Sequence, residues 1–380
     1  MDALMLPLNW QRVRLGTYKY RRGSFPQPYG NPQWYSDNGM PFVQVYDVGE
    51  NFKLTQKTKQ KISKIAQPMS VFVPKNSVII TLQGTIGRVA LTQYDCYCDR
   101  TILIFDNNTL NDVNKYFFVL SLFTKFKEEK RKADGSIIKT ITKQTLKDFE
   151  IPLPPLNEQI AIANILSDLD RYLCALDALI LKKEGVKEAL SFELLSQRKR
   201  LKGFNQAWQK VRLGDIANYL TSNLSVEQIT QQGKIKVYDV NNFIGYTDTT
   251  FISDKPYISI VKDGSVGRVR ILPPKTNILS TMGALIANHR TTTEFLFYLL
   301  SNFDFKNFTS GSIIPHIYFK DYKEKTIFLP PLNEQSAIAN ILSDLDSEII
   351  SLKNKKRQFD NIKKALNHDL MSAKIRVLEK

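Results

Sequence analysis

The chain has 380 residues, 43% hydrophobic and 11% aromatic, a composition that excludes extensive disorder and allows two or three domains. Its 53 Lys and Arg outnumber 37 Asp and Glu, and the formal charge of +16 favours a polyanionic partner, nucleic acid before an anionic membrane surface. The sequence has no apolar run that could cross a bilayer and no signal-peptide pattern near its start. We therefore expect a cytoplasmic protein with no membrane partner.

The cysteines indicate neither a disulfide framework nor a metal centre. Cys96, Cys98 and Cys174 are too few for a framework, and a C-x-C pair without a second close Cys or His pair is a poor zinc signature. We expect no metal and no cofactor.

The first predicted elements are short strands followed by a buried helix. The runs at 40–48, 70–82 and 101–105 are rich in β-branched and aromatic residues and are separated by Gly, Asn and Pro, which is typical of strands joined by turns. The run NKYFFVLSLFTKF at 114–126 predicts a helix that packs on the resulting sheet. The front part of the chain is therefore predicted to be a mixed α/β domain.

A long helix follows the sequence LPPLNEQ that begins at Leu153. Pro154 and Pro155 favour an extended approach, Asn157 is the expected N-cap, and Glu158 places negative charge in the first turn, where the helix dipole favours it. Apolar residues then recur at alternating intervals of four and three, which is the spacing of a seam that faces a partner helix. The seam consists of Ile162, Leu166, Leu169, Leu173, Leu176 and Ile180, and Leu190 and Leu194 extend it.

The second half of the chain repeats the first. The stretches WQRVRLG at Trp10, VYDV at Val45, GTIGRV at Gly84, GSIIK at Gly135 and LPPLNEQ at Leu153 return in the same order. Their copies begin at 208, 237, 264, 311 and 329, so the interval falls from 198 to 176 residues and then holds. The run TEFLFYLLSNF at 293–303 predicts the second short helix, and a second long helix follows at 329–380. The two halves therefore share the same ordered set of motifs, whereas the segments between the motifs differ in length.

Two matched helices of about 45 residues are too long for one small domain to cover, so we expect each to cover the other. Like units pair most simply about a pseudo-two-fold axis, which predicts antiparallel helices with the two globular parts toward opposite ends. The predicted fold class is α+β, with two mixed α/β domains separated by an antiparallel coiled coil. The expected boundaries are 1–152 for the first domain, 153–203 for its helix, 204–328 for the second domain and 329–380 for the last helix.

The sequence contains no pattern that indicates catalysis. It has no G-x-S-x-G, no H-E-x-x-H and no phosphate-binding loop, and its histidines, His289, His316 and His368, have no counterparts in the other half. The repeated GTIGR and GSVGR stretches predict tight turns that present Arg88 and Arg268 outward, and Arg can bind guanine or phosphate through two parallel hydrogen bonds.

These motifs resemble the specificity subunit of a type I DNA restriction-modification system, and the resemblance runs from Trp10 to about Val377. It implies that each globular part is a target recognition domain that reads half of a bipartite, asymmetric DNA site. It implies that the helices set the spacer and dock methyltransferase subunits, two of them, and that restriction subunits join through the complex. It also implies a non-catalytic protein of a bacterium or archaeon.

The expected DNA-binding residues are basic, amide-bearing or hydroxyl side chains in the loops of both domains. They are Arg21, Arg22, Gln44, Tyr46, Lys75, Gln83, Thr85 and Arg88 in the first domain, and Tyr238, Asn241, Asn242, Lys262, Ser265, Arg268, His289, Arg290 and His316 in the second. Two alternatives stay open. One is a stand-alone DNA-modifying or DNA-cleaving enzyme with an unrecognised site, and the other is a coiled-coil scaffold whose charge maintains solubility.

Overall fold

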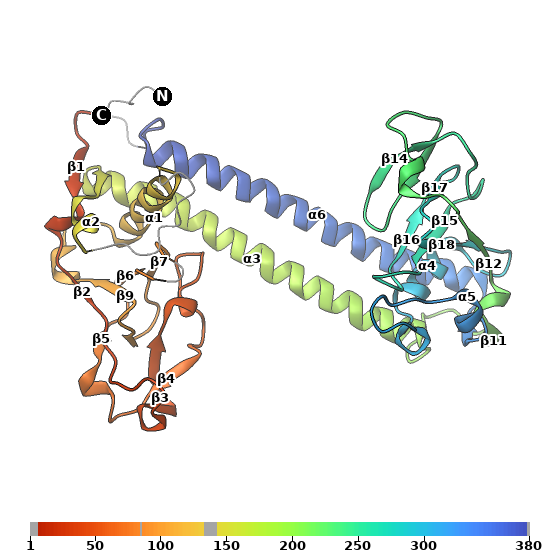
Figure 1. Ribbon diagram of the computed structural model, residues 1–380, viewed down its shortest axis with the longest axis horizontal. Coiled ribbons are helices and arrows are strands. Elements are labelled where there is room, and N and C mark those ends of the chain that lie inside the picture. Colours follow the sequence, from red (N-terminus) through yellow and green to blue (C-terminus); the bar gives the residue numbers. More distant parts are fainter. Residues whose placement is uncertain (1–6, 84–85, 133–142, 378–380) are drawn as a thin grey trace. The chain divides into compact units, whose positions relative to one another are not determined.

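The computed structural model describes residues 7–83, 86–132 and 143–377. Contacts divide the chain into two compact units, the first formed by residues 1–175 with 357–380 and the second by residues 176–356. Each unit contains one mixed α/β domain and segments of both long helices, which Figure 1 labels α3 and α6. Within the described ranges, every helix is too short or too polar to cross a membrane.

The domain of the first unit has two four-stranded sheets and a two-stranded ribbon. The sheet orders are β2-β9-β6-β7 and β4-β3-β8-β5, and β1 pairs with β10 in the ribbon. The strands are β1 (Gln11–Arg14), β2 (Tyr20–Arg22), β3 (Tyr35–Val43), β4 (Gln60–Ile62), β5 (Val71–Val73), β6 (Val78–Thr81), β7 (Val89–Leu91), β8 (Cys96–Cys98), β9 (Ile102–Phe105) and β10 (Glu150–Leu153). The helices are α1 (Lys115–Lys132) and α2 (Lys143–Asp148).

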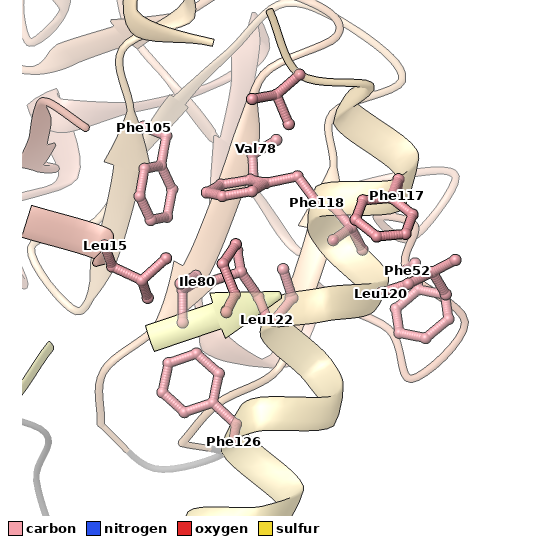
Figure 2. Close-up of a cluster of buried hydrophobic side chains, with 14 of the residues drawn as sticks. Leu15, Phe52, Val78, Ile80, Phe105, Phe117, Phe118, Leu120, Leu122 and Phe126 are labelled. Carbon is pink, nitrogen blue, oxygen red and sulfur yellow. The ribbon is translucent and has the colours of Figure 1, made fainter. Parts of the chain in front are cut away.

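A phenylalanine-rich core joins the first sheet to α1. Figure 2 shows Phe118 of α1 beside Phe105 of β9 and Phe126 of α1 near Ile80 of β6, and Phe117 belongs to the same core. Burying a side chain of this size stabilises the fold by about 1.5 to 3 kcal/mol. The same core includes Leu370 and Met371 at the end of α6 and Ile162 and Leu166 near the start of α3. The domain therefore shares one core with both long helices.

The domain of the second unit repeats this arrangement with fewer strands in its second sheet. Its sheet orders are β12-β18-β15-β16 and β14-β13-β17, and β11 pairs with β19. The strands are β11 (Gln209–Arg212), β12 (Ala217–Thr221), β13 (Ile235–Tyr238), β14 (Phe243–Thr247), β15 (Tyr257–Val261), β16 (Val269–Leu272), β17 (Asn277–Ile278), β18 (Met282–Ala287) and β19 (Thr326–Leu329). The helices are α4 (Thr293–Ser301) and α5 (Phe319–Tyr322).

The predicted duplication is confirmed at the level of topology. The parallel pair β3 and β8 has its counterpart in β13 and β17, and the antiparallel neighbours of β6 match those of β15. The predicted strand at 101–105 and the predicted helices at 114–126 and 293–303 are confirmed, although α1 extends to Lys132, and the run at 70–82 forms two strands, β5 and β6. The strand predicted at 40–48 is only partly confirmed, because β3 ends at Val43 and Val45–Asp47 form a 3-10 helix. The fold is thus α+β with an internal repeat.

The long helices are α3 (Leu156–Leu195) and α6 (Leu332–Met371), 40 residues each, or about 60 Å of helix. They are shorter than the expected 45 residues. The prediction that Asn157 is the N-cap was wrong, because the helix already begins at Leu156 and the Pro155 carbonyl accepts the amides of Glu158 and Gln159 at 3.0 Å. Proline, which lacks a donor, thus supplies the first acceptor.

The helix segments within each unit are antiparallel, as predicted. In the second unit Lys183 contacts Glu348 at 2.8 Å, whereas Lys187, one turn later in α3, contacts Asp346, which comes earlier in α6. In the first unit Asp170 contacts Lys363, and Tyr172 packs on Phe359. Most of the predicted seam of α3 is buried, namely Ile162, Leu166, Leu173, Leu176, Ile180 and Leu194, and the matching apolar residues of α6 that are buried are Ile338, Leu342, Ile349 and Leu370. The ends of both helices pack on the domains, since Ile162, Leu166 and Leu370 belong to the core of the first domain and Leu194, Ile338 and Leu342 to that of the second.

A buried glutamate near the start of each long helix binds an arginine and a tryptophan. Glu334 accepts hydrogen bonds from Arg200 at 2.6 and 3.1 Å and from the Trp208 indole at 3.0 Å. Glu158 accepts from Arg376 at 2.6 and 3.0 Å and from the Trp10 indole at 3.1 Å. The two glutamate side chains are 0% and 3% exposed. We call each set the glutamate clamp, and it ties the start of one helix to the segment that follows the other.

The glutamine after each of these glutamates ties the helix to its domain. The side-chain NH2 group of Gln159 donates to the Pro154 carbonyl at 2.8 Å, and its side-chain oxygen accepts a hydrogen bond from the backbone N–H of Asn114. The Asn114 side chain in turn caps α1. The Gln335 oxygen accepts the amide of Thr292, which caps α4. The repeated Glu-Gln pair therefore explains why the LPPLNEQ stretch occurs twice, since each copy fixes a helix start against its own domain.

Loss of the carboxylate in the second clamp should destabilise the protein. Glu334→Ala leaves the Arg200 guanidinium and the Trp208 indole without their acceptor, so we expect the free energy of unfolding to fall by about 2 to 3 kcal/mol. Urea unfolding followed by circular dichroism measures it. The control is Glu348→Ala on the same helix, whose carboxylate is 45% exposed and should matter by less than about 0.5 kcal/mol. Equal losses in the two variants would contradict a structural role for the clamp.

Candidate nucleic-acid interface

The turn between β15 and β16 presents Arg268 to solvent, as predicted. The backbone closes through bonds of 2.9 Å from the Val261 amide to the Arg268 carbonyl and from the Gly267 amide to the Val261 carbonyl. Gly267 has φ of 81°, and a Cβ there would lie 2.6 Å from the Phe305 ring, so only glycine fits. Arg268 is exposed, and within the described part of the chain no hydrogen bond or ion pair engages its side chain.

A second loop lies against this turn and brings His316 to it. Asp263 and His316 form an isolated bridge, the Gly264 amide donates to the Pro315 carbonyl at 2.9 Å, and the His316 ring lies 2.7 Å from the Asp263 carboxylate. Lys262 and Ser265 belong to the same turn. The structure thus gathers four of the expected residues, Lys262, Ser265, Arg268 and His316, into one loop cluster.

Three more of the expected residues lie in or next to a turn after β13, beside an arginine that the sequence analysis missed. The Arg270 guanidinium donates to the Asn241 carbonyl at 3.0 Å and lies over the Tyr238 ring, 5.2 Å from its centroid. The backbone N–H groups of Asn241 and Asn242 donate hydrogen bonds to the Asp239 carboxylate. Arg270 stands two residues after Arg268 and therefore on the same side of β16. The alternation along a strand after the turn could have indicated it.

His289 and Arg290 lie apart from this cluster. They follow β18, whose first residue Met282 pairs with Val261 and whose last pairs with Ala217 at the other end of the sheet. The Arg290 carbonyl accepts the Gln335 amide at 2.9 Å, and its side chain lies 3.3 Å from Gln209. These two residues are therefore at the start of α6, at the opposite end of the sheet from the 262–268 turn.

The matching turn of the first domain differs. Arg88 does not point freely outward: its guanidinium donates to the Val48 carbonyl at 3.2 Å and to the Glu50 carboxylate at 2.8 Å. Two backbone hydrogen bonds close this turn as in the second domain, from the Thr81 amide to the Arg88 carbonyl at 3.0 Å and from the Gly87 amide to the Thr81 carbonyl at 2.9 Å. Gly87 has φ of 76° and lies beside the Phe126 ring. The expectation that both arginines are presented outward is therefore wrong for Arg88, because an acidic side chain lies within its reach. Gln83 is exposed, and Thr85 lies outside the described residues.

The remaining expected residues of the first domain do not form one cluster. Arg21 and Arg22 are exposed on the edge strand β2, where the Arg21 side chain donates to the Phe72 carbonyl at 3.1 Å. Gln44 and Tyr46 are hydrogen-bonded to each other on the segment that also supplies Val48 and Glu50 to Arg88. Lys75 precedes β6 and so lies at the opposite end of that strand from Arg88.

The described residues contain no cluster of side chains suited to a metal ion. Within residues 7–83, 86–132 and 143–377 there is no group of three or more His, Cys, Asp or Glu side chains that could hold a metal ion. The three cysteines are free; Cys96 and Cys98 are buried, and burial raises the pKa of the Cys98 thiol well above its ordinary value. The arrangement of exposed Arg, Lys and amide groups is suited to contacts with phosphates and base edges.

Comparison with known proteins places the chain in a family. The family described as "Type I restriction modification DNA specificity domain" matches residues 28–183 and 205–359. The chain is 23% identical over 420 residues to the type I restriction enzyme MjaVIII specificity subunit of Methanocaldococcus jannaschii, covering 99% of this chain and 95% of that protein. It is 30% identical over 290 residues to the putative MjaX specificity subunit of the same organism, covering 69% and 68%.

The fold has a solved counterpart in the crystal structure of the S subunit of a type I restriction-modification system from M. genitalium. The TM-score is 0.65 at 21% identity, and the match covers 96% of this chain and 98% of that one. The repeat seen in the sequence and in the sheets agrees with two matches of one family domain in a single chain. The chain therefore belongs to the family of type I restriction-modification DNA specificity proteins.

Proposed function

We propose that this protein is the specificity subunit of a type I restriction-modification complex and that each α/β domain reads one half of a bipartite DNA site. The observation that supports this most is the repeated turn after β6 and β15, which is closed in both domains by two equivalent backbone hydrogen bonds and a glycine of positive φ, whereas its polar surroundings differ. Among the described residues Arg268 has no hydrogen-bond or ion-pair partner, and Arg270 follows two residues later in β16. Arg88, in contrast, is bound to Glu50, and the residue that matches Arg270 is Ala90. Two different reading surfaces imply an asymmetric target.

The distribution of charge supports DNA binding by the domains. The two long helices carry 13 Asp and Glu against 10 Lys and Arg. The rest of the chain therefore holds 43 basic against 24 acidic side chains, so the whole positive excess lies outside the helices. Contacts of such an excess with phosphates contribute affinity that falls steeply with salt and carries no sequence information. Base-reading groups at the turns would then supply the choice of sequence.

The long helices would set the spacer between the half-sites and dock two methyltransferase subunits, through which restriction subunits join. A 40-residue helix is about 60 Å long, a length that corresponds to about 18 base pairs at 3.4 Å each. Both helices leave large apolar side chains exposed, among them Leu181, Phe192, Ile350 and Ile362. The protein itself would contribute no catalytic group.

Exchange of one recognition domain tests the proposed function. Replacing residues 1–152 by the corresponding domain of another specificity subunit should change one half of the DNA target and leave the other half intact, because each domain has its own core. The replacement must retain a tryptophan at the position of Trp10 so that the first glutamate clamp forms. Sequencing of methylated sites in cells that express the complete system gives the target. A change in both halves, or in neither, would contradict the proposal.

Arg268 and Arg88 should respond differently to substitution. Arg268→Ala should weaken binding to the target by about 1 to 3 kcal/mol and relax one half-site, because the free guanidinium is available to a base edge. Arg88→Ala is the matched comparison, and its main effect should be on stability, since it removes the contacts with Val48 and Glu50. Fluorescence anisotropy with target and single-base variants measures both. Uniform weakening on every sequence by Arg268→Ala would indicate a phosphate contact instead.

Lengthening both helices together should lengthen the spacer. The helix contacts place Asp177 opposite Lys356, so the midpoint of the pair lies near Ala178 in α3 and Asn354 in α6. Four helix-forming residues inserted after each of these positions add about 6 Å, so the preferred gap should grow by about two base pairs. Methylation of a series of duplexes with different gaps measures it. An unchanged preferred gap in a folded, assembled variant would exclude the helices as the spacer.

A further inference from the structure

The loop that reaches the β15–β16 turn carries two isoleucines at its tip. Ile313 is 92% exposed and Ile314 is 56% exposed, whereas Ile317, three residues further along, is 1% exposed. The chain therefore buries one isoleucine of this short segment in the domain core and directs the other two into solvent. Two adjacent isoleucines that are largely exposed to water are unfavourable for an isolated domain, and such residues mark contacts with a partner.

The base of this loop is held rigidly. Ser310 and His316 exchange backbone hydrogen bonds of 2.9 and 2.7 Å, and the Ile317 amide donates to the Lys262 carbonyl at 2.9 Å. Gly311 has φ of 90°, and a Cβ there would lie 2.3 Å from the Ile314 carbonyl oxygen, so the loop closes only with glycine. Pro315 restricts the backbone on the other side. The tip is thus a fixed projection.

The charges around this loop favour DNA as the partner. Its base lies on the turn that carries Lys262 and Arg268, and the Lys320 ammonium lies over the Tyr318 ring just beyond it. Asp263, the acidic residue at the base, is already bound to His316. The sequence G-S-I-I occurs at 135–138 as well as at 311–314, although the two residues that follow it differ. Both isoleucines were therefore retained where their neighbours changed.

We propose that Ile313 and Ile314 form a wedge that inserts between two stacked base pairs of the half-site bound by the second domain. The inference rests on the proposed DNA-binding function and adds a second way of reading sequence. Apolar side chains that enter a base step unstack it and kink the duplex. Because the energy of unstacking depends on the step, the wedge would discriminate sequences without a hydrogen bond to a base.

Fluorescence of 2-aminopurine tests the wedge. The half-site is first defined by sequencing methylated sites, and the probe then replaces one base at a time in a duplex bound by the full chain. We expect fluorescence to rise several-fold at one step and to stay low for the variant Ile313→Ser with Ile314→Ser. The control Ile65→Ser, which alters an exposed isoleucine of the first domain, should keep the signal.

A mismatch at the responding step gives an independent readout. It removes most of the stacking that the wedge must break, so it should tighten binding of the unaltered chain by about tenfold and leave the affinity of the double variant unchanged. Normal specific binding without a fluorescent step, or a signal that persists in the double variant, would overturn the wedge. So would a double variant that binds DNA normally but no longer assembles with the methyltransferase subunit. If the unaltered chain bound no duplex specifically, the proposed function itself would fail.

Discussion

The architecture depends on two buried carboxylates. Each is placed in the first turn of a long helix and binds an arginine from beyond the other helix and a tryptophan from the strand region of its domain. Glu158 and Glu334 stand 176 residues apart, and so do their partners Arg376 and Arg200. Since a buried ion pair adds little net stability but strongly disfavours any arrangement that leaves it unpaired, the clamp selects one geometry. Each unit therefore fixes a domain, a helix start and a helix end together.

A second pair of equivalent contacts, further along the helices, also links each long helix to the other helix and to a domain. Asp170 binds Lys363 and the Tyr116 hydroxyl in the first unit, and Asp346 binds Lys187 and the Tyr298 hydroxyl in the second. Burial, and then the hydrogen bond to aspartate, raises the pKa of each tyrosine well above 10, so both stay neutral donors. The lysines and aspartates obey the same spacing as the clamps, whereas the tyrosines come from different turns of α1 and α4. The Asp–Lys contacts between the long helices are thus the same in both units, whereas the position of the tyrosine in the domain helix differs.

Periodicity and duplication were sufficient to predict the strand regions at 70–82 and 101–105, the helices α1 and α4 and the antiparallel direction of the long helices, but not the shorter strands or the helices α2 and α5. The clamps were not foreseen, although WQ[RK]VRLG and LPPLNEQ were both recognised as repeats, because no local pattern pairs Trp10 or Arg376 with Glu158 across 148 and 218 residues. Extending the repeat past the helix ends would have matched Arg200 with Arg376. No such signal indicated that Arg88 binds Glu50, since Glu50 lies in a loop whose length differs between the halves.

The division between frame and reading surface has a physical basis in the repeated turn. In both domains a glycine with positive φ lies against a phenylalanine ring, Phe126 or Phe305, which fixes the backbone whatever side chain follows. The residue after that glycine is arginine in both copies, yet only its surroundings decide whether it is available: Glu50 and Val48 engage one, and solvent surrounds the other. Under the function proposed above, changes in the neighbours of the turn would alter the target while the turn and the clamps stay the same.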